Sequence, residues 1–271
     1  MNIKRLLSGI ILFPIFAILM VFGDTYLIDL VISIVAIMCL HEFYKAFRCN
    51  SKPIEWVGYI AAGSIALIHL IPSELVLPII AAIIPVSILV LFTRVILSDL
   101  KLTITDIAIT FFGICYIVLF LMFAPIIRAN IPNGKILIWF VFLSAWGTDV
   151  FAYIVGKNFG KHKFTAVSPK KTIEGCLGGI VGATLLILAY TAVCNNAWGL
   201  NINYLYAGVI AVLLSCISQI GDLSASTIKR FCNIKDFGNL MPGHGGILDR
   251  FDSIMFVAPI VYIFFKVYMG M

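Results

Sequence analysis

Residues 75–97 read LVLPIIAAIIPVSILVLFTRVIL, and Arg94 is the only charged side chain in this run. A transmembrane helix needs about 20 consecutive, mostly apolar residues to cross the hydrocarbon core of a bilayer. Inside that core every backbone N–H and C=O group must find its partner within the protein, which a helix provides. This stretch therefore predicts a helix that crosses a membrane.

The rest of the chain has the same character. Of its 271 residues, 62% are hydrophobic and 12% are charged, and the mean hydropathy is +1.08. Soluble domains carry about 25% charged residues. The composition therefore excludes a soluble enzyme, a disordered protein and a nucleic-acid-binding protein. The seven cysteines form no CxxC pair and show no metal-like spacing, so we interpret them as small core residues.

Apolar runs of helical length recur along the whole sequence. They predict an all-α polytopic membrane protein with about nine transmembrane helices. Lys4 and Arg5 precede an apolar run as in a signal peptide, but we interpret this run as an uncleaved first helix. The third run is short, so about eight spans is the alternative. The expected spans are residues 6–22, 26–44, 56–71, 75–97, 104–127, 136–155, 176–193, 205–220 and 253–269.

Most of the 19 lysines and arginines fall in alternate connections between these runs. Cytoplasmic connections of membrane proteins carry an excess of Lys and Arg. We therefore expect the amino terminus inside the cell and the carboxyl terminus outside. The cytoplasmic connections 156–175 and 221–252 are the richest in charge, which places the active site on that side. We expect an amino-terminal transmembrane region over residues 1–130 and a catalytic region over residues 131–271.

The second charged connection begins GDLSASTIKRFC at residue 221. Asp222, Ser226, Lys229 and Arg230 share one helix face if the preceding span continues as a helix beyond the membrane. The excess of Lys and Arg expected in cytoplasmic connections explains the basic residues, but it gives no reason for carboxylates beside them. The alternative for each residue alone is a solvated loop charge, because a lone surface ion pair contributes under about 1 kcal/mol.

Carboxylates recur at the start of the last expected span. Asp249 and Asp252 are three residues apart and share a face there. Asp222 and Asp249 both adjoin apolar runs, where an aspartate at bilayer depth costs about 3 kcal/mol. Mg²⁺ binds one or two carboxylates and keeps water and substrate phosphates as its other ligands. We therefore expect Asp222 and Asp249 to form a magnesium site.

Between these aspartates lies the segment PGHGG, residues 242–246. Glycines let a backbone approach a phosphate closely and direct N–H groups at it. Basic side chains supply further phosphate ligands. The candidates in this region are His244, Gly245, Gly246, Lys229, Arg230, Lys235 and Arg250.

The first charged connection ends with SPKKTIE, residues 168–174. Ser168 and Pro169 resemble an N-cap followed by proline at the first helical position. The free N–H groups of such a helix start would attract an anion. Ordinary lysine flanking of a span is the equally weighted alternative. Glu174 is either a capping partner or a ligand, and the candidate phosphate ligands here are Lys170, Lys171 and Thr172.

Three further features lie within expected spans. Asp149 is an intramembrane carboxylate, which favours a place facing a polar cavity over a buried structural role. His41 and Glu42 end the second span, and we interpret them as an interfacial pair with satisfied hydrogen bonds. The small-residue spacing after residue 174 indicates close helix packing rather than chemistry. Its members are Gly175, Gly178, Gly179 and Gly182.

These motifs together resemble the phosphatidate cytidylyltransferase (CDP-diacylglycerol synthase) family. The similarity is carried by Ser226-x-x-Lys229-Arg230, Lys235-Asp236-x-Gly238 and Pro242-x-His244-Gly245-Gly246-x-x-Asp249-Arg250-x-Asp252. A second similar stretch runs from Asp149 through Ala152-Tyr153, Gly156 and Gly160-Lys161 to Ser168-Pro169-Lys170-Lys171-Thr172-x-Glu174-Gly175. Met241 is a conservative departure from the family pattern. The resemblance is specific over about residues 145–255, and the first 130 residues match only as a hydrophobic polytopic region.

The resemblance implies that the protein converts CTP and phosphatidate of the inner leaflet to CDP-diacylglycerol and pyrophosphate at the cell membrane, with Mg²⁺ required. It also implies a homodimer and a second, monovalent cation. The implied metal ligands are Asp222 and Asp249, with Asp149, Glu174 and Asp236 as further candidates. The implied catalytic residues are Asp222, Asp249, Lys229, Arg230 and Asp252. Substrate binding is expected from Lys170, Lys171, Thr172, Ser226, Lys235, His244, Gly245, Gly246 and Arg250.

Two other classes of protein remain open from the residues. A CTP-dependent polyprenol or phytol kinase-like transferase would use similar groups but attack the γ-phosphorus. An ion-coupled transporter would explain Asp149 and Asp222 as relay residues. It would not need the PGHGG segment or a cytoplasmic basic cradle.

Overall fold

The computed structural model describes residues 17–49, 51–99, 101–239 and 245–270. These residues form helices, the longest connections follow α9 and α11, and their only paired extended segment is a single bridge between Lys163 and Thr172. The expected all-α class is confirmed. The first helices are α2 (Thr25–Phe47), α3 (Glu55–Gly63), η1 (Ser64–Leu70), α4 (Ser73–Leu97), α5 (Ile104–Gly113), η2 (Ile114–Val118), α6 (Leu119–Leu121) and α7 (Phe123–Asn130). The remaining helices are α8 (Gly134–Leu137), α9 (Trp139–Phe159), α10 (Ile173–Trp198), α11 (Tyr204–Phe231) and α12 (Leu248–Tyr268).

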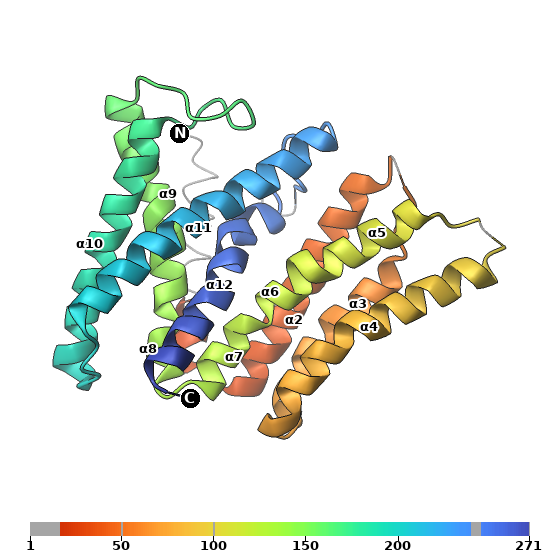
Figure 1. The fold of residues 1–271 in the computed structure, drawn as a ribbon, viewed down its shortest axis with the longest axis horizontal. Coiled ribbons are helices and arrows are strands. Elements are labelled where there is room, and N and C mark those ends of the chain that lie inside the picture. The colour runs from red at the N-terminus through yellow and green to blue at the C-terminus, as the bar shows by residue number, and fades with distance from the viewer. Residues whose placement is uncertain (1–16, 50, 100, 240–244, 271) are drawn as a thin grey trace. The chain divides into compact units, whose positions relative to one another are not determined.

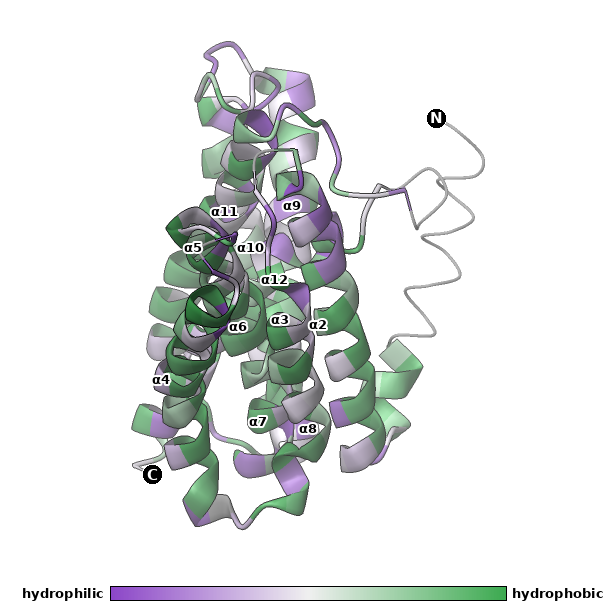
Figure 2. Cartoon of the chain, turned by 90° about the vertical axis from the view of Figure 1, so that its right-hand side faces the viewer, coloured by the Kyte–Doolittle hydropathy of each residue, from purple (hydrophilic) through white to green (hydrophobic). Residues whose placement is uncertain are grey.

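Within the described residues, seven helical segments are long and apolar enough to cross a membrane. Apolar residues cover most of the helical shafts, as Figure 2 shows. The segment Glu55–Leu70 is shorter, and its second part, η1, is a 3₁₀ helix. The first expected span lies mostly outside the described residues, and residues 17–22 of it are helical. The protein is a multi-pass membrane protein, while its total number of spans and its orientation stay predictions.

The contacts divide the chain into two compact units. The first contains residues 1–130 and 231–250, and the second contains residues 131–230 and 251–271. The expected division into an amino-terminal region over residues 1–130 and a catalytic region over residues 131–271 is not tested by these contacts. The assignment of catalysis to residues 131–271 stays a prediction.

In the first unit, α2 is fixed at both ends by local polar contacts and packing. Its N-cap Asp24 accepts a hydrogen bond from the backbone N–H of Leu27 at 2.7 Å. Near its carboxyl end, Phe43 and Tyr44 are fully buried, and the Tyr44 hydroxyl donates to the carbonyl of Thr110 at 3.0 Å. This packing holds the carboxyl-terminal half of α2 against α5.

In the second unit, α9 and α10 run side by side (Figure 1) because glycines line their contact. A Cβ on Gly178 would meet Val155 at 2.5 Å, and one on Gly182 would overlap the ring of Phe151. The expected packing role of these glycines is confirmed. The Thr148 hydroxyl donates to the Ser215 hydroxyl at 2.7 Å, which ties α9 to α11.

The start of α10 differs from the expected N-cap. α10 begins at Ile173 and its N-cap is Thr172, whose hydroxyl accepts from the N–H of Gly175 at 3.1 Å. The N-cap expected at Ser168 is therefore wrong. The carbonyl of Ser168 instead accepts from the N–H of Lys171 at 3.0 Å, so Pro169 lies in a turn before the helix.

Candidate functional site

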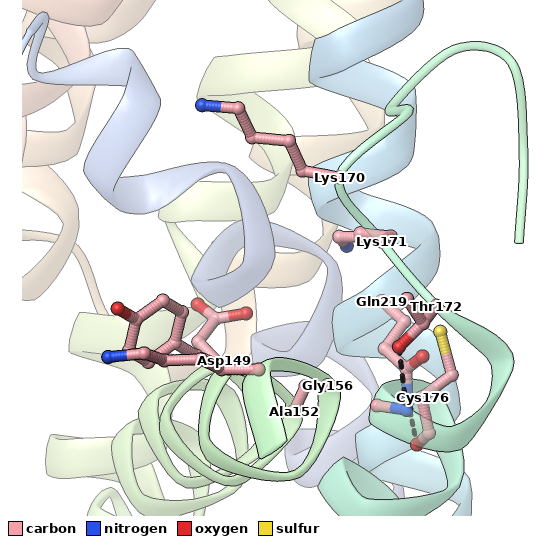
Figure 3. Close-up of a pocket in the computed structure, with 11 residues that line it drawn as sticks. Asp149, Ala152, Gly156, Lys170, Lys171, Thr172, Cys176 and Gln219 are labelled. Atoms are coloured by element: carbon pink, nitrogen blue, oxygen red, sulfur yellow. Dashed lines mark hydrogen bonds between the residues drawn. The ribbon is translucent and has the colours of Figure 1, made fainter. Parts of the chain in front are cut away.

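The second unit contains a cavity of about 310 Å³ at the start of α10. The side chains of Asp149 on α9, Lys170 and Lys171 in the preceding connection, and Gln219 on α11 line it, as Figure 3 shows. Three of the residues expected to bind phosphate, Lys170, Lys171 and Thr172, are therefore brought together at one cavity. The full lining is Asp149, Ala152, Tyr153, Gly156, Lys157, Lys170, Lys171, Thr172, Gly175, Cys176 and Gln219.

The connection that carries the two lysines is held by backbone hydrogen bonds. The N–H of Phe164 donates to the carbonyl of Lys171 at 2.9 Å, and the N–H of Ile173 donates to the carbonyl of His162 at 2.9 Å. Together with the turn at Pro169, these bonds fix the path of residues 162–173. Lys170 and Lys171 are thus presented by an ordered loop next to the amino-terminal end of α10.

Lys171 forms an ion pair with Asp222 of α11, and the two side chains are 23% and 27% exposed. Partial burial reduces the screening of such a pair by solvent. The sequence interpretation placed these residues in one site from separate motifs, and the structure brings them into direct contact. A bound anion next to Lys171 would compete with Asp222 for its ammonium group.

Asp252 on α12 extends this set of charges. It is buried, at 6% exposure, and lies within electrostatic range of Asp222, Asp149 and Lys229. Its Oδ1 accepts from the N–H of Ser253 at 2.7 Å. Asp252 and these three charged side chains of α9 and α11 therefore share one electrostatic environment in the second unit.

Ser226 and Arg230 follow Asp222 along α11. The helix runs to Phe231, so the expected common face of these residues exists. Ser226 is buried at 9% exposure. The Arg230 Nε donates to the carbonyl of Val167 at 3.3 Å, which links the end of α11 to the connection before α10.

Glu174 makes its contacts with the connection after α9 and not with the other candidate residues. Its carboxylate accepts from the N–H groups of Lys161 and His162 and lies 2.6 Å from the His162 Nδ1. It is not among the residues that line the described cavity. These contacts fix the connection that follows α9, and the two roles left open from the sequence, capping partner and metal ligand, both stay predictions.

The first unit holds the remaining candidates, in the segment before α12 and in the first turn of that helix. The Asp249 Oδ2 accepts from the N–H groups of Phe237 and Gly246, each at 3.0 Å. Gly245 has φ +81°, and a Cβ there would lie 3.2 Å from the Asp249 Oδ2 and 3.4 Å from the Asp236 Oδ1. Asp236, Gly245, Gly246 and Asp249 are thus neighbours. Lys235 and Arg250 are exposed, and His244 lies outside the described residues.

One carboxylate next to this segment, Glu42, was not among the predicted site residues. Glu42 on α2 is 6% exposed, and its two oxygens accept from the N–H groups of Ile247 at 3.1 Å and Leu248 at 2.9 Å. His41 also has a partner, because its Nδ1 lies 3.1 Å from the Tyr59 hydroxyl. The satisfied hydrogen bonds expected for His41 and Glu42 are therefore present, while their place at the membrane interface stays a prediction.

Two residues of the cavity were also missed. The Gln219 amide donates to the carbonyl of Cys176 at 3.2 Å, and it precedes Asp222 by one helical turn. This spacing places Gln219 on the same helix face as Asp222, so the sequence could have indicated it as a site residue. The Lys157 ammonium lies 5.9 Å from the centre of the Tyr153 ring, one turn earlier on α9.

Among the described residues, no three His, Cys, Asp or Glu side chains are grouped closely enough to form a metal site by themselves. Mg²⁺ does not require such a group, because it commonly uses one or two carboxylates together with water and substrate phosphates. The donors offered by Asp222, Asp252, Asp149 and Asp249 are carboxylate oxygens, the type that suits this ion. The residues present therefore fit magnesium in their chemistry.

Comparison with known proteins identifies relatives along the whole chain. The sequence profile of the Cytidylyltransferase family matches residues 3–268. A phosphatidate cytidylyltransferase of Staphylococcus aureus (strain COL) is 34% identical over 267 residues, covering 96% of this chain and 97% of that protein.

Two further relatives carry the same name. The protein of Bacillus subtilis (strain 168) is 39% identical over 177 residues, which cover 65% of this chain and 64% of the relative. The protein of Synechocystis sp. (strain ATCC 27184 / PCC 6803 / Kazusa) is 41% identical over 137 residues, which cover 50% and 45%. The matched segments thus span less than two thirds of these two relatives.

Proposed function

Because the chain belongs to the cytidylyltransferase family, we propose that it transfers the cytidylyl group of CTP to phosphatidate, giving CDP-diacylglycerol and pyrophosphate for phospholipid biosynthesis. The observation that carries the proposal is the match along nearly the whole chain to a relative with that name. The cavity that gathers Lys170, Lys171 and Asp149 supports it, because both substrates are phosphates.

The reaction requires little covalent chemistry from the protein. A phosphate oxygen of phosphatidate attacks the α-phosphorus of CTP, a new P–O bond forms, and the bond to the β-phosphate oxygen breaks. The attacking phosphate is already anionic, so no strong general base is needed. Catalysis then depends on bringing two anions together and stabilising the leaving pyrophosphate.

The side chains of the second unit suit this task. Lys170 and Lys171 bind phosphate oxygens at the cavity, and the amino-terminal end of the α10 dipole adds to the positive potential there. Asp222 holds Lys171 in place until a phosphate competes for it. Lys229 and Arg230 then bind the pyrophosphate or the headgroup of the lipid. Ser226, Lys235, His244, Gly245, Gly246 and Arg250 are proposed as further substrate ligands.

We propose that Asp222 and Asp249 hold Mg²⁺, with Asp149, Asp236, Asp252 and Glu174 as further candidate ligands or as groups that orient the cations. When bound, Mg²⁺ would neutralise phosphate charge and orient the nucleotide. We also propose a second, monovalent cation at this site. The burial of Asp252 supports bound cations, because an ionised carboxylate inside the protein needs cations or hydrogen-bond donors.

The proposed location is the cytoplasmic membrane, with the site at its inner surface. There a soluble nucleotide can meet a lipid of the inner leaflet. A homodimer is proposed from the resemblance to the family.

Product analysis tests the proposed function. Purified protein in detergent is incubated with CTP, phosphatidate and Mg²⁺, and the lipid products are identified by mass. We expect CDP-diacylglycerol and pyrophosphate in equal amounts without any membrane gradient, which a transporter would not produce. Absence of a cytidine-containing lipid from active, folded protein would refute the proposal.

A further inference from the structure

The backbone at the start of α12 is held by two carboxylates that come from different helices. Asp249 binds the N–H of Gly246, while Glu42 binds the next two N–H groups, those of Ile247 and Leu248. The first N–H groups of a helix have no partner within that helix, so acceptors from elsewhere stabilise its start. Glu42 thus caps α12 although it is 205 residues away from Ile247 in sequence.

Two glycines of the same segment leave space for the Glu42 side chain. A Cβ on Gly238 would overlap the Glu42 carboxylate, and its three nearest neighbours would all be Glu42 atoms. A Cβ on Gly246 would overlap the other carboxylate oxygen and lie 2.8 Å from the N of Gly238. The close approach of Glu42 therefore accounts for the lack of side chains at both positions.

Glu42 also lies within electrostatic range of Asp249. Burying one carboxylate near another is unfavourable unless N–H groups and cations compensate. Here the two groups divide three consecutive N–H donors between them, so the position of one depends on the other. Any shift of residues 246–248 would move Asp249, which follows them directly on α12.

We propose that Glu42 is a positioning residue, which fixes the start of α12 so that the Asp249 carboxylate is held ready to bind a divalent cation. This role rests on the proposed function of Asp249. Glu42 itself touches neither substrate nor metal in this role. Groups that support metal ligands commonly change metal affinity or activity by about 10- to 100-fold when they are replaced.

Two variants disturb this contact in different ways. Glu42→Gln keeps the size of the side chain but replaces one acceptor with an NH₂ donor that would face an N–H group. Gly238→Ala keeps the charge of Glu42 and displaces its carboxylate by an added methyl group. Glu74→Gln is the matched control, because Glu74 is an exposed glutamate in the first turn of α4.

The first measurement uses protein without metal or substrate. Amide hydrogen exchange is followed in the peptide that contains residues 245–252, and the thermal midpoint confirms folding. We expect faster exchange at Ile247 and Leu248 in Glu42→Gln and Gly238→Ala, and wild-type exchange in Glu74→Gln. The second measurement is the Mg²⁺ concentration for half-maximal activity, which we expect to rise about tenfold in the first two variants.

Wild-type exchange and an unchanged Mg²⁺ requirement in Glu42→Gln would overturn the proposal. A loss of activity with an unchanged Mg²⁺ requirement would also overturn it, because Glu42 would then serve folding alone. If Glu42→Gln fails to fold, the same two measurements on Gly238→Ala test whether Glu42 positions Asp249. If wild-type protein makes no nucleotide lipid, the proposed function fails, while the exchange data still show whether Glu42 fixes the start of α12.

Discussion

Lys171 and Asp222 form a partly buried ion pair that ties the connection before α10 to the carboxyl-terminal half of α11. The two residues belong to separate charged connections in the sequence. Their contact joins a residue proposed to bind phosphate to one proposed to bind metal. It therefore provides a direct way to test whether the two motifs act as one site.

Lys171→Ala removes the ammonium group from the cavity and leaves Asp222 without this partner. We expect kcat/KM for CTP to fall by about tenfold or more, because hydrogen bonds to charged groups contribute about 1.5–3 kcal/mol. Steady-state kinetics of the purified variant would measure this. Lys163→Ala is the control, because Lys163 is an exposed lysine in the same connection. Equal losses in both variants would argue against a specific role for Lys171.

Asp222→Asn keeps the shape of the side chain and removes its charge. We expect turnover to fall by about 100-fold or more if the carboxylate binds metal, while the protein still inserts and elutes as a folded species. Activity and size-exclusion profiles at several Mg²⁺ concentrations would check this. Normal activity in the variant would exclude Asp222 as a metal ligand.

The contact between α9 and α10 predicts a difference between two glycine substitutions. In Gly182→Ala the new methyl group would overlap the Phe151 ring, so we expect a loss of about 1–3 kcal/mol in unfolding free energy. In Gly208→Ala on α11 the nearest atom lies at 3.8 Å, so stability should be unchanged or slightly increased. Thermal unfolding in detergent compares the two, and similar midpoints would contradict the packing described for Gly182.

Cysteine labelling tests the expected orientation. Cys49, after α2, is the exposed cysteine of the described residues. The pKa of the Cys232 thiol is raised to about 11, first because burial disfavours the thiolate and then because Cys49 is near. Since only the thiolate reacts, Cys232 should stay unlabelled at pH 8. A membrane-impermeant maleimide should label Cys49 in inverted vesicles and not in intact cells, and the opposite pattern would reverse the orientation.

The fold class could be predicted from the sequence because the physical constraint is strong. A run such as residues 75–97 must form a helix if it lies in a bilayer, and α4 covers it. Helix ends were less predictable, because they depend on local competition for hydrogen bonds. Ser168 resembled an N-cap, but its carbonyl closes a turn with Lys171 and the helix starts after Thr172.

The candidate site was predictable where its residues follow a short spacing. Lys170, Lys171 and Thr172 are adjacent in sequence and all line the cavity. Glu42 could not be predicted in this way, because its partners Ile247 and Leu248 lie on another helix far along the chain. A single sequence does not reveal such a contact, since nothing in the local pattern around Glu42 refers to α12.

The most direct test of the proposed function follows which part of CTP reaches the lipid. Purified protein receives phosphatidate, Mg²⁺ and CTP labelled either in the cytosine base or in the γ-phosphate. Attack at the α-phosphorus predicts base label in the lipid product and γ-label in pyrophosphate. Label from the γ-phosphate in the lipid, with none from the base, would contradict cytidylyl transfer and indicate a CTP-dependent lipid kinase.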